Sequence, residues 1–345
     1  ASLRENVKYY QENNYAQLIR TIDLKNNFTN SDFVYVDEVA YDFLWRVQLK
    51  EPNIVLPNIG ANIGEKYYVK PQDLPKNKNV LGPNAILLRS KCNDTHFVYF
   101  RLSTSSYDNE MKKLVGASGQ PKFNKTDLKK VSLFMPSLIE QKRIAYFLAL
   151  LEERIATQNK IIDKLQSLIK GIAQKIVRSN KSNVRLYECV ECSSSTQQES
   201  EVCEQGAYPV YGANGIVGYL DDYNTEGEAV YIIKDGSGVG TVSYVTGKCS
   251  ATGTLNTLQA KDGYSLQYLY YLLKVFNFEP YKTGMAIPHI YFKDYGKAKV
   301  FCPSYTEQLQ YARLLSAIDS KLSVEKNTLR NLSLQKQYLL RQMFI

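Results

Sequence analysis

Residues 136–177 read PSLIEQKRIAYFLALLEERIATQNKIIDKLQSLIKGIAQKIV, and residues 303–344 read PSYTEQLQYARLLSAIDSKLSVEKNTLRNLSLQKQYLLRQMF. The two stretches align without a gap at an offset of 167 residues. In both, apolar residues recur at alternating steps of four and three, which predicts a long amphipathic helix with a narrow apolar seam. The identical positions are Pro136/Pro303, Ser137/Ser304, Glu140/Glu307, Gln141/Gln308, Ala145/Ala312, Leu148/Leu315 and Leu165/Leu332.

A narrow seam needs a partner helix, and the simplest partner for each copy is the other copy. About forty residues at a rise of about 1.5 Å make a rod on the order of 60 Å long. Gln158 and Glu325 interrupt the two seams at the same position, either as a register device or by chance. Two helices buried in an ordinary globular core are the alternative. The seam residues are Leu148, Leu151, Ile155, Ile162 and Leu165 in the first stretch and Leu315, Ile318, Leu322, Leu329 and Leu332 in the second.

Each stretch begins with a capping-box pattern. Ser137 precedes Glu140 by three residues, and Ser304 precedes Glu307 in the same way, so both helices are expected to begin here.

The composition favours a protein with an acidic partner. The formal net charge is +9, and nucleic acid is the commonest acidic partner, although a merely basic soluble protein has the same charge. No stretch is apolar enough to span a membrane, and the first ten residues lack the apolar region of a signal peptide. Six scattered cysteines fit a reducing cytoplasm. The lone CxxC of Cys189 and Cys192 lacks further zinc ligands, so we expect no metal site.

The repeat divides the chain into four segments. They are a first globular unit (1–135), a first long helix (136–178), a second globular unit (184–302) and a second long helix (303–345). Short β-type runs separated by Pro, Gly and Asn predict that both units are β-rich. The expected strands are 33–36, 53–56, 66–69, 85–88, 229–233 and 241–245. The expected helices are 108–115, 264–276 and part of 6–27.

The globular units also match each other. Pro121/Pro288, Asp127/Asp294 and Lys130/Lys297 keep the offset of 167, and residues 60–64 (GANIG) match residues 236–240 (GSGVG) at an offset of 176. The architecture is therefore unit, helix, unit, helix.

No catalytic motif is present. The glycines at 236–240 are followed by the β-type run TVSYV, whereas a dinucleotide fingerprint requires a helix there, so a tight turn between strands is expected. There is no Walker A sequence and no Asn/Asp-Pro-Pro-Tyr segment of adenine methyltransferases. His96 and His289 belong to no triad or metal pattern. We therefore expect a protein without catalytic activity of its own and without a cofactor.

Three segments resemble the specificity subunit of type I restriction–modification systems. Leu133-Phe-Met-Pro-Ser-Leu-Ile-Glu-Gln141 and Val300-Phe-Cys-Pro-Ser-Tyr-Thr-Glu-Gln308 look like that family's Pro-x-x-x-Glu-Gln start of a conserved helix. Tyr208-Pro-Val-Tyr-Gly-Ala-Asn-Gly-Ile-Val-Gly-Tyr219 also resembles the family, and the first unit has no counterpart to it.

The resemblance implies an α+β fold of two β-rich target recognition domains, each followed by a long helix. The helices would pair as an antiparallel coiled coil with pseudo-two-fold symmetry. Each domain would read one half of a split site in double-stranded DNA, and the helices would set the gap. They would also dock two methylation subunits that bind S-adenosylmethionine, which restriction subunits then join.

DNA contacts require Lys and Arg for phosphates and polar side chains for base edges. The candidate DNA-binding residues are Asn62, Lys66, Lys122, Asn124 and Lys125 in the first unit and Asn214, Lys234, Ser237, His289 and Lys293 in the second. The competing hypothesis is a non-catalytic coiled-coil scaffold that presents two β-rich modules to protein or carbohydrate.

Overall fold

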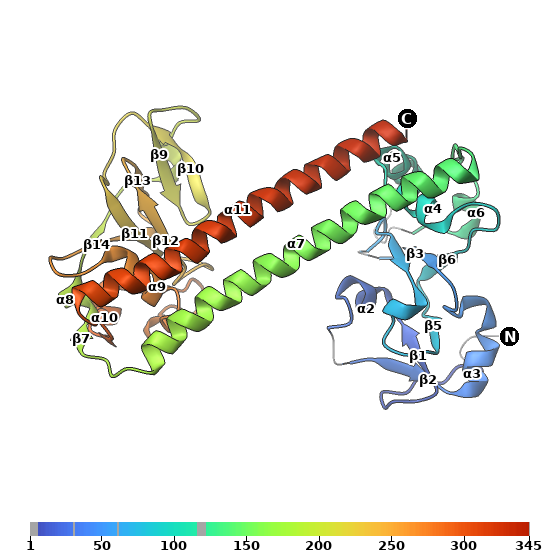
Figure 1. The fold of residues 1–345 in the computed structure, drawn as a ribbon, viewed down its shortest axis with the longest axis horizontal. Coiled ribbons are helices and arrows are strands. Elements are labelled where there is room, and N and C mark those ends of the chain that lie inside the picture. Colours follow the sequence, from blue (N-terminus) through green and yellow to red (C-terminus); the bar gives the residue numbers. More distant parts are fainter. Residues whose placement is uncertain (1–5, 30–31, 61, 116–121, 345) are drawn as a thin grey trace. The chain divides into compact units, whose positions relative to one another are not determined.

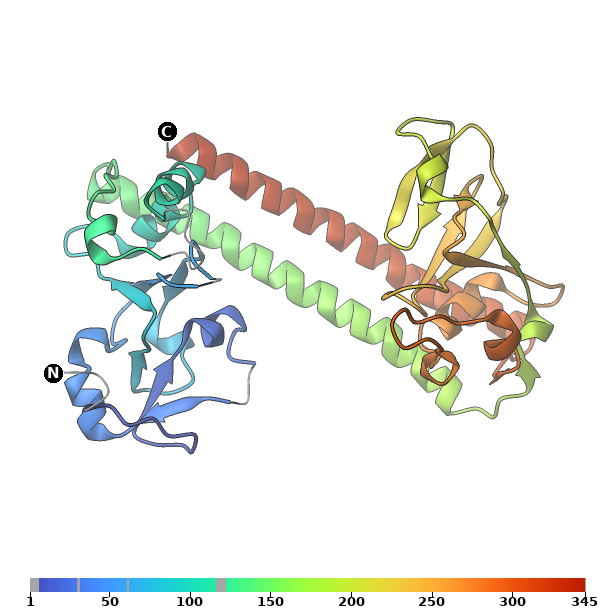
Figure 2. The same ribbon diagram turned by 180° about the vertical axis from the view of Figure 1, so that it is seen from behind.

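The two longest elements of the described chain are helices of 41 and 39 residues. Helix α7 spans Leu138–Arg178 and helix α11 spans Tyr305–Met343 in the computed structural model (Figure 1, and from behind in Figure 2). The structure describes residues 6–29, 32–60, 62–115 and 122–344. The chain divides into two compact units that each contain part of both helices. Unit 1 comprises residues 1–157 and 329–345, and unit 2 comprises residues 158–328.

The two helices run antiparallel within each unit. In unit 1, Lys336 Nζ lies 2.6 Å from Glu152 Oε1, and Phe344 packs in a cluster with Leu148. In unit 2, the Gln158 amide donates to the backbone oxygen of Glu325 at 3.1 Å and also to the Glu325 carboxylate. A residue that faces its own repeat equivalent is what pairing about a two-fold axis requires.

The seam residues line the contact between these helices. Leu148 and Leu315 are almost completely buried because each meets both the other helix and a globular unit. Leu151, Ile162, Leu322 and Leu332 are buried as well, whereas Ile155, Leu165, Ile318 and Leu329 are half-buried.

The second helix starts with a complete capping box. Ser304 donates its backbone N–H and its hydroxyl to Glu307 Oε2, at 3.2 and 2.7 Å, and Glu307 N–H donates back to Ser304 Oγ at 3.4 Å. At the first helix, Glu140 N–H donates to Ser137 Oγ at 3.4 Å.

The globular part of unit 1 contains two three-stranded sheets, ordered β2-β1-β5 and β4-β3-β6. Strand β1 pairs antiparallel with β2 and parallel with β5, whereas β3 is antiparallel to both of its neighbours. Helices α4 and α5 cover one face of the β3 sheet. The strands are β1 (Ala16–Ile19), β2 (Val34–Val36), β3 (Asn53–Pro57), β4 (Tyr67–Val69), β5 (Asn79–Leu81) and β6 (Ala85–Leu88). The helices are α2 (Thr21–Lys25), α3 (Glu38–Phe43), α4 (Thr95–Leu102), α5 (Ser105–Leu114) and α6 (Lys125–Leu128).

The expected strands and helices of unit 1 are confirmed, but β1, β5, α3, α4 and α6 were not predicted. Strand β1 lies within the region 6–27, for which only partial helix was expected. The Ala117–Pro121 segment, which includes one of the repeat-matched prolines, lies outside the described residues.

Unit 2 is built around a four-stranded antiparallel sheet, β12-β11-β14-β8, whose two faces are both buried. Val230 and Ile232 of β11 face helix α9, while Tyr231 and Ile233 face the sheet β10-β9-β13. The strands are β7 (Val184–Arg185), β8 (Val190–Ser194), β9 (Tyr208–Gly212), β10 (Gly215–Leu220), β11 (Glu228–Ile233), β12 (Val242–Thr246), β13 (Ser250–Ala251), β14 (Leu255–Ala260) and β15 (Lys299–Val300). The helices are α8 (Leu186–Cys189), α9 (Leu266–Leu273) and α10 (Phe292–Tyr295).

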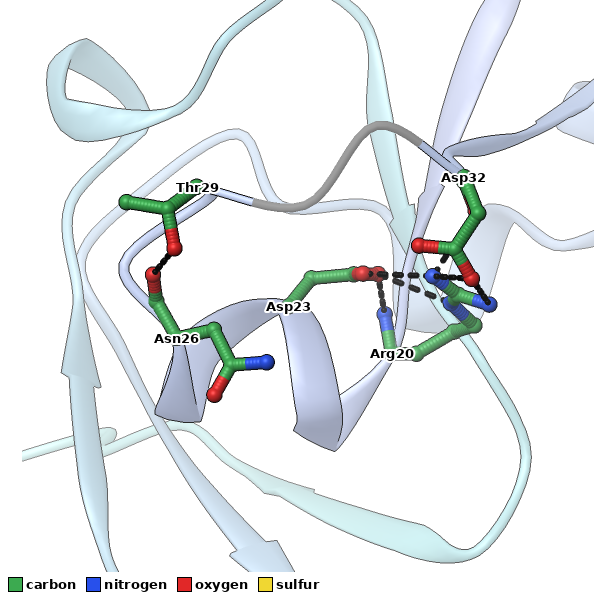
Figure 3. A network of polar contacts seen from close by, with 5 residues as sticks. All are labelled: Arg20, Asp23, Asn26, Thr29 and Asp32. Carbon is green, nitrogen blue, oxygen red and sulfur yellow. Dashed lines mark hydrogen bonds and ion pairs between the residues drawn. The ribbon is translucent and has the colours of Figure 1, made fainter. Parts of the chain in front are cut away.

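An ion pair between the half-buried Arg20 and the buried Asp23 holds the loop that follows β1 in unit 1 (Figure 3). The Arg20 guanidinium contacts the fully buried Asp23 carboxylate at 2.7 Å and donates to the Asp32 backbone oxygen at 2.9 Å. Thr29 Oγ1 donates to the Asn26 backbone oxygen at 2.7 Å. The Asp23 carboxylate raises the pKa of Arg20. This network fixes α2 between β1 and β2.

Across the ranges that the structure describes, no helix is both long enough and apolar enough to cross a membrane.

Candidate nucleic-acid interface

The glycine turn of unit 2, residues 236–240, connects β11 to β12. These strands pair antiparallel, so the predicted tight turn between strands is confirmed. Gly236 and Gly240 have φ of +95° and +89°, a region that glycine adopts without steric cost. The Gly240 N–H donates to the Ile233 oxygen at 2.9 Å, which closes the turn.

The segment around His289 lies beside this turn and is hydrogen-bonded to the residues that precede it. Asp235 and His289 form an antiparallel bridge, and their side chains meet with His289 Nδ1 2.6 Å from Asp235 Oδ1. The Ile290 N–H donates to the Lys234 oxygen at 2.9 Å. Three of the candidate residues, Lys234, Ser237 and His289, therefore lie on two adjoining backbone segments, and Ser237 is exposed at the turn.

Unit 1 contains the same construction. Ile59 and Lys122 form an antiparallel bridge, and the Phe123 N–H donates to the Asn58 oxygen at 3.1 Å. Gly60 and Gly64 have φ of +88° and +92°. Ile59 corresponds to Asp235 at the offset of 176, and Lys122 corresponds to His289 at the offset of 167. Both units thus place a glycine turn beside a segment that leads into a short helix.

Near Lys122, one candidate residue caps a helix and two lysines are exposed. Asn124 caps α6, because its side-chain oxygen accepts from the backbone N–H groups of Thr126 at 2.7 Å and Asp127 at 3.0 Å. The Asn124 backbone N–H, followed by the Lys130 ammonium, lowers the pKa of Asp127. Lys122 and Lys125 are exposed.

In unit 2 the corresponding helix is α10. Lys293 is exposed, and its Nζ lies 5.3 Å from the centre of the Tyr291 ring. Asn214 is also exposed, but it lies in the β9–β10 turn, on a different sheet from the glycine turn.

Two candidate residues of unit 1 have structural partners. The Lys66 ammonium pairs with Asp108, and its side chain is only 11% exposed. Asn62 Oδ1 accepts from Lys25 Nζ at 2.9 Å, and Lys25 also pairs with Glu65 at 2.9 Å. Lys66 therefore links β4 to α5, while Asn62 lies in the glycine turn.

Sequence reasoning missed the role of Gln141 and Gln308. Each is buried at the start of a long helix. Gln141 Oε1 accepts from the N–H of Asp94, the N-cap of α4, at 2.9 Å. Gln308 Oε1 accepts from the N–H of Ser265, the N-cap of α9, at 2.9 Å. The sequence repeat shows that both positions are glutamine, but it does not show that these side chains bond to the N-cap of a short helix.

Each glutamine also donates to the proline that opens its segment, at 2.8 Å to the Pro136 oxygen and 2.9 Å to the Pro303 oxygen. In both copies, therefore, one glutamine side chain holds the start of the long helix against the first residues of a short helix in the same globular unit.

Within the described ranges, no three His, Cys, Asp or Glu side chains gather as a metal site. Cys189 Sγ lies 3.8 Å from Cys302 Sγ in the buried core, while Cys192 is on β8. A cavity of about 810 Å³ in unit 1 is lined by residues that include Lys66, Tyr68, His96 and Glu152, and by no described residue of the glycine turn.

Comparisons with known proteins agree on one family. The family model described as Type I restriction modification DNA specificity domain matches residues 5–167 and 179–333. The Type I restriction enzyme EcoprrI specificity subunit of Escherichia coli is 27% identical over 117 residues, which cover 34% of this chain and 29% of that protein. A putative type I specificity subunit of Mycoplasma genitalium is 24% identical over 275 residues, covering 73% of this chain and 71% of that protein. The match to the first relative thus spans about a third of its length.

Two solved structures share the fold. A crystal structure of the S subunit of a type I restriction–modification system from M. genitalium matches with a TM-score of 0.66 and 17% identity. The match covers 100% of this chain and 95% of that one. A chain from a structure on complex assembly and conformational transition of the type I system matches with a TM-score of 0.54 and 14% identity. It covers 99% of this chain and 92% of that one.

Proposed function

Because the chain belongs to the Type I restriction modification DNA specificity domain family, we propose that it is the DNA sequence-recognition subunit of a type I restriction–modification complex. Each globular unit reads one half of a bipartite site in double-stranded DNA. The long helices set the gap between the halves. The chain carries no catalytic chemistry, which belongs to its partners.

One observation carries the proposal: the same glycine turn and adjoining segment are built twice. Ile59–Lys122 in unit 1 and Asp235–His289 in unit 2 are equivalent bridges at the offsets given by the sequence repeat. Two related reading surfaces in one chain fit a site with two halves. The two turns differ in sequence, GANIG at 60–64 and GSGVG at 236–240, which fits two different half-site sequences.

The candidate DNA-binding residues fall into three groups, two that contact DNA and one that supports the contacting surface. Lys122, Lys125 and Lys293 are exposed cations suited to phosphates. Asn214, Ser237 and His289 are exposed or half-exposed polar groups suited to base edges. Asn62, Lys66, Asn124 and Lys234 support the surface through their side-chain or backbone contacts.

The partners are two methylation subunits, which bind S-adenosylmethionine, and restriction subunits that join them, in the cytoplasm. Exposed apolar side chains on the long helices, including Ile139, Phe147, Leu314 and Val324, offer contact area for such partners.

Methylome sequencing of cells carrying the system tests the proposal. We expect a methylated motif of two short halves with a fixed gap, and its loss when this gene is deleted. A motif that persists unchanged after deletion contradicts the proposal.

Purified chain alone should bind DNA weakly, with an affinity that falls steeply as salt rises. It should transfer no methyl group from S-adenosylmethionine. Binding that is absent with and without partners favours the coiled-coil scaffold instead.

A further inference from the structure

The segment Thr283–His289 of unit 2, here called the tip loop, is closed at its base. Thr283 and His289 exchange two backbone hydrogen bonds of 2.8 Å each. The five residues between them, Gly284-Met-Ala-Ile-Pro288, therefore project from a fixed base.

The tip loop is held tightly in one conformation. Gly284 has a φ of +88°, and a Cβ at this position would lie 2.3 Å from the Ile287 oxygen, so only glycine fits. The Pro288 oxygen accepts from the Gly236 N–H at 3.0 Å, which attaches the loop to the glycine turn. The 2.6 Å contact between His289 and Asp235 adds a side-chain anchor.

The loop presents apolar side chains to solvent. Met285 is fully exposed at 108%, the highest value among the large apolar side chains of the described chain, and Ile287 is 57% exposed. The next apolar residue, Ile290, is 1% exposed in the core. Exposed apolar surface is unfavourable in water, and the closed base prevents these side chains from folding back.

Polar and cationic groups surround the base of the tip loop. Lys282 precedes it and pairs with Glu279 at 2.6 Å, Ser237 is exposed on the adjoining turn, and Lys293 is exposed just beyond it. A small apolar tip above a polar base differs from a protein-docking patch, which requires a broad apolar surface. It matches the wedges that DNA-binding proteins insert between base pairs, for which Met, Ile and Pro are used.

We propose that the tip loop is a DNA wedge that inserts Met285 and Ile287 into the stack of the half-site read by unit 2, unstacking one base step. This inference rests on the proposed function. The wedge acts in one half-site, because the sequence of unit 1 has the polar residues Ser118 and Gln120 at the positions equivalent to Met285 and Ile287.

The test uses the complex with its methylation subunits and duplexes that carry the split site. 2-Aminopurine is placed at each position of both half-sites in turn, apart from the methylated bases. The wild-type complex should raise fluorescence at one step of one half-site. The double variant Met285→Ser, Ile287→Ser should lose this signal and bind about tenfold more weakly, with the same half-site sequences. The control Val39→Ser removes an apolar side chain that is 77% exposed, on α3 of unit 1, and should keep the signal.

The proposal is overturned if the wild-type complex binds without unstacking, or if the double variant keeps the signal. It is also overturned if the double variant fails to assemble with the methylation subunits, because the loop then contacts protein. A wild-type complex that does not bind a split site contradicts the proposed function itself, and the wedge proposal, which rests on that function, is then rejected as well.

Discussion

Gln141 and Gln308 illustrate how one side chain can join a helix to a globular unit. Each is buried and satisfies a helix N-cap N–H and a proline oxygen at once. Removing such a side chain leaves buried polar groups without partners, which costs more than the bonds themselves contribute.

We expect Gln308→Ala to lower the free energy of unfolding by about 1–3 kcal/mol, because the Ser265 N–H and the Pro303 oxygen lose their partner. Urea unfolding of the purified chain measures this. Gln335→Ala, at an exposed position of α11, is the matched control and should change stability by less than about 0.5 kcal/mol. Equal stabilities of the two variants would count against the docking role.

His96 provides a pH dependence in unit 1. Its ring stacks on Tyr68 with a centroid distance of 4.1 Å and on Phe100 at 4.6 Å. Burial lowers the pKa of His96 below its ordinary value. Nearby charges act in both directions: Glu152 and Asp94 raise the pKa, whereas Lys70 and Lys336 lower it.

A histidine with a lowered folded-state pKa binds protons more readily when unfolded. The contribution of neutral His96 to the free energy of unfolding should therefore be fully present above about pH 6.5, the ordinary histidine pKa. It should be lost as the pH drops through the lowered pKa of the folded state. We expect His96→Phe, which keeps the ring stack, to remove this part of the acid sensitivity. Urea unfolding at several pH values between about 7.5 and 5 measures it. Identical pH profiles for the wild type and the variant would refute the assignment.

At the scale of elements, the long helices are stabilised along one seam. Leu315 is 1% exposed, whereas its neighbour Leu314 is 51% exposed. Gln158 and Glu325 lie opposite each other in the same seam, which makes the interruption a contact between the helices. Lys321, followed by Gln158, lowers the pKa of Glu325, so this contact is made by a carboxylate.

Leu315→Ala should destabilise the protein by about 3 kcal/mol, because it opens a cavity between helix and unit. Leu314→Ala has the same chemistry on the exposed side and should cost less than about 0.5 kcal/mol. The midpoint of urea unfolding compares the two. A large loss at Leu314 and none at Leu315 would contradict the seam assignment.

At the scale of the whole molecule, helix length should determine the gap in the DNA site. A heptad adds about 10 Å to a helix, which equals roughly three base pairs of duplex. Inserting seven residues into both α7 and α11 should therefore lengthen the gap by roughly three base pairs. The half-site sequences should stay unchanged, because the recognition units are untouched.

Methylome sequencing of cells with the lengthened chain reads the outcome. A five-residue insertion is the control, because it turns the seam away from its partner and should abolish assembly. An altered half-site with an unchanged gap would contradict the role of the helices as a spacer.

The sequence alone determined the two helices, their mutual pairing and the β-rich character of both units. Heptad spacing and capping boxes are local patterns, and an internal repeat can be aligned without a structure. Strand β1 was missed because it lies between β2 and β5, and β5 is about sixty residues further along the chain, so local composition carries no trace of that pairing.

Only the tertiary structure decided which candidate residues meet. It joined Lys122 to the turn at Gly60 and His289 to the turn at Gly236, segments roughly fifty to sixty residues apart in the chain. It assigned Lys66 to an ion pair and Asn124 to a helix cap, and it exposed Met285 on a closed loop. The physical reason is that the contacts and exposure of a side chain depend on packing between distant segments. Helix periodicity, in contrast, can be recognised from the apolar residues in a short window of sequence.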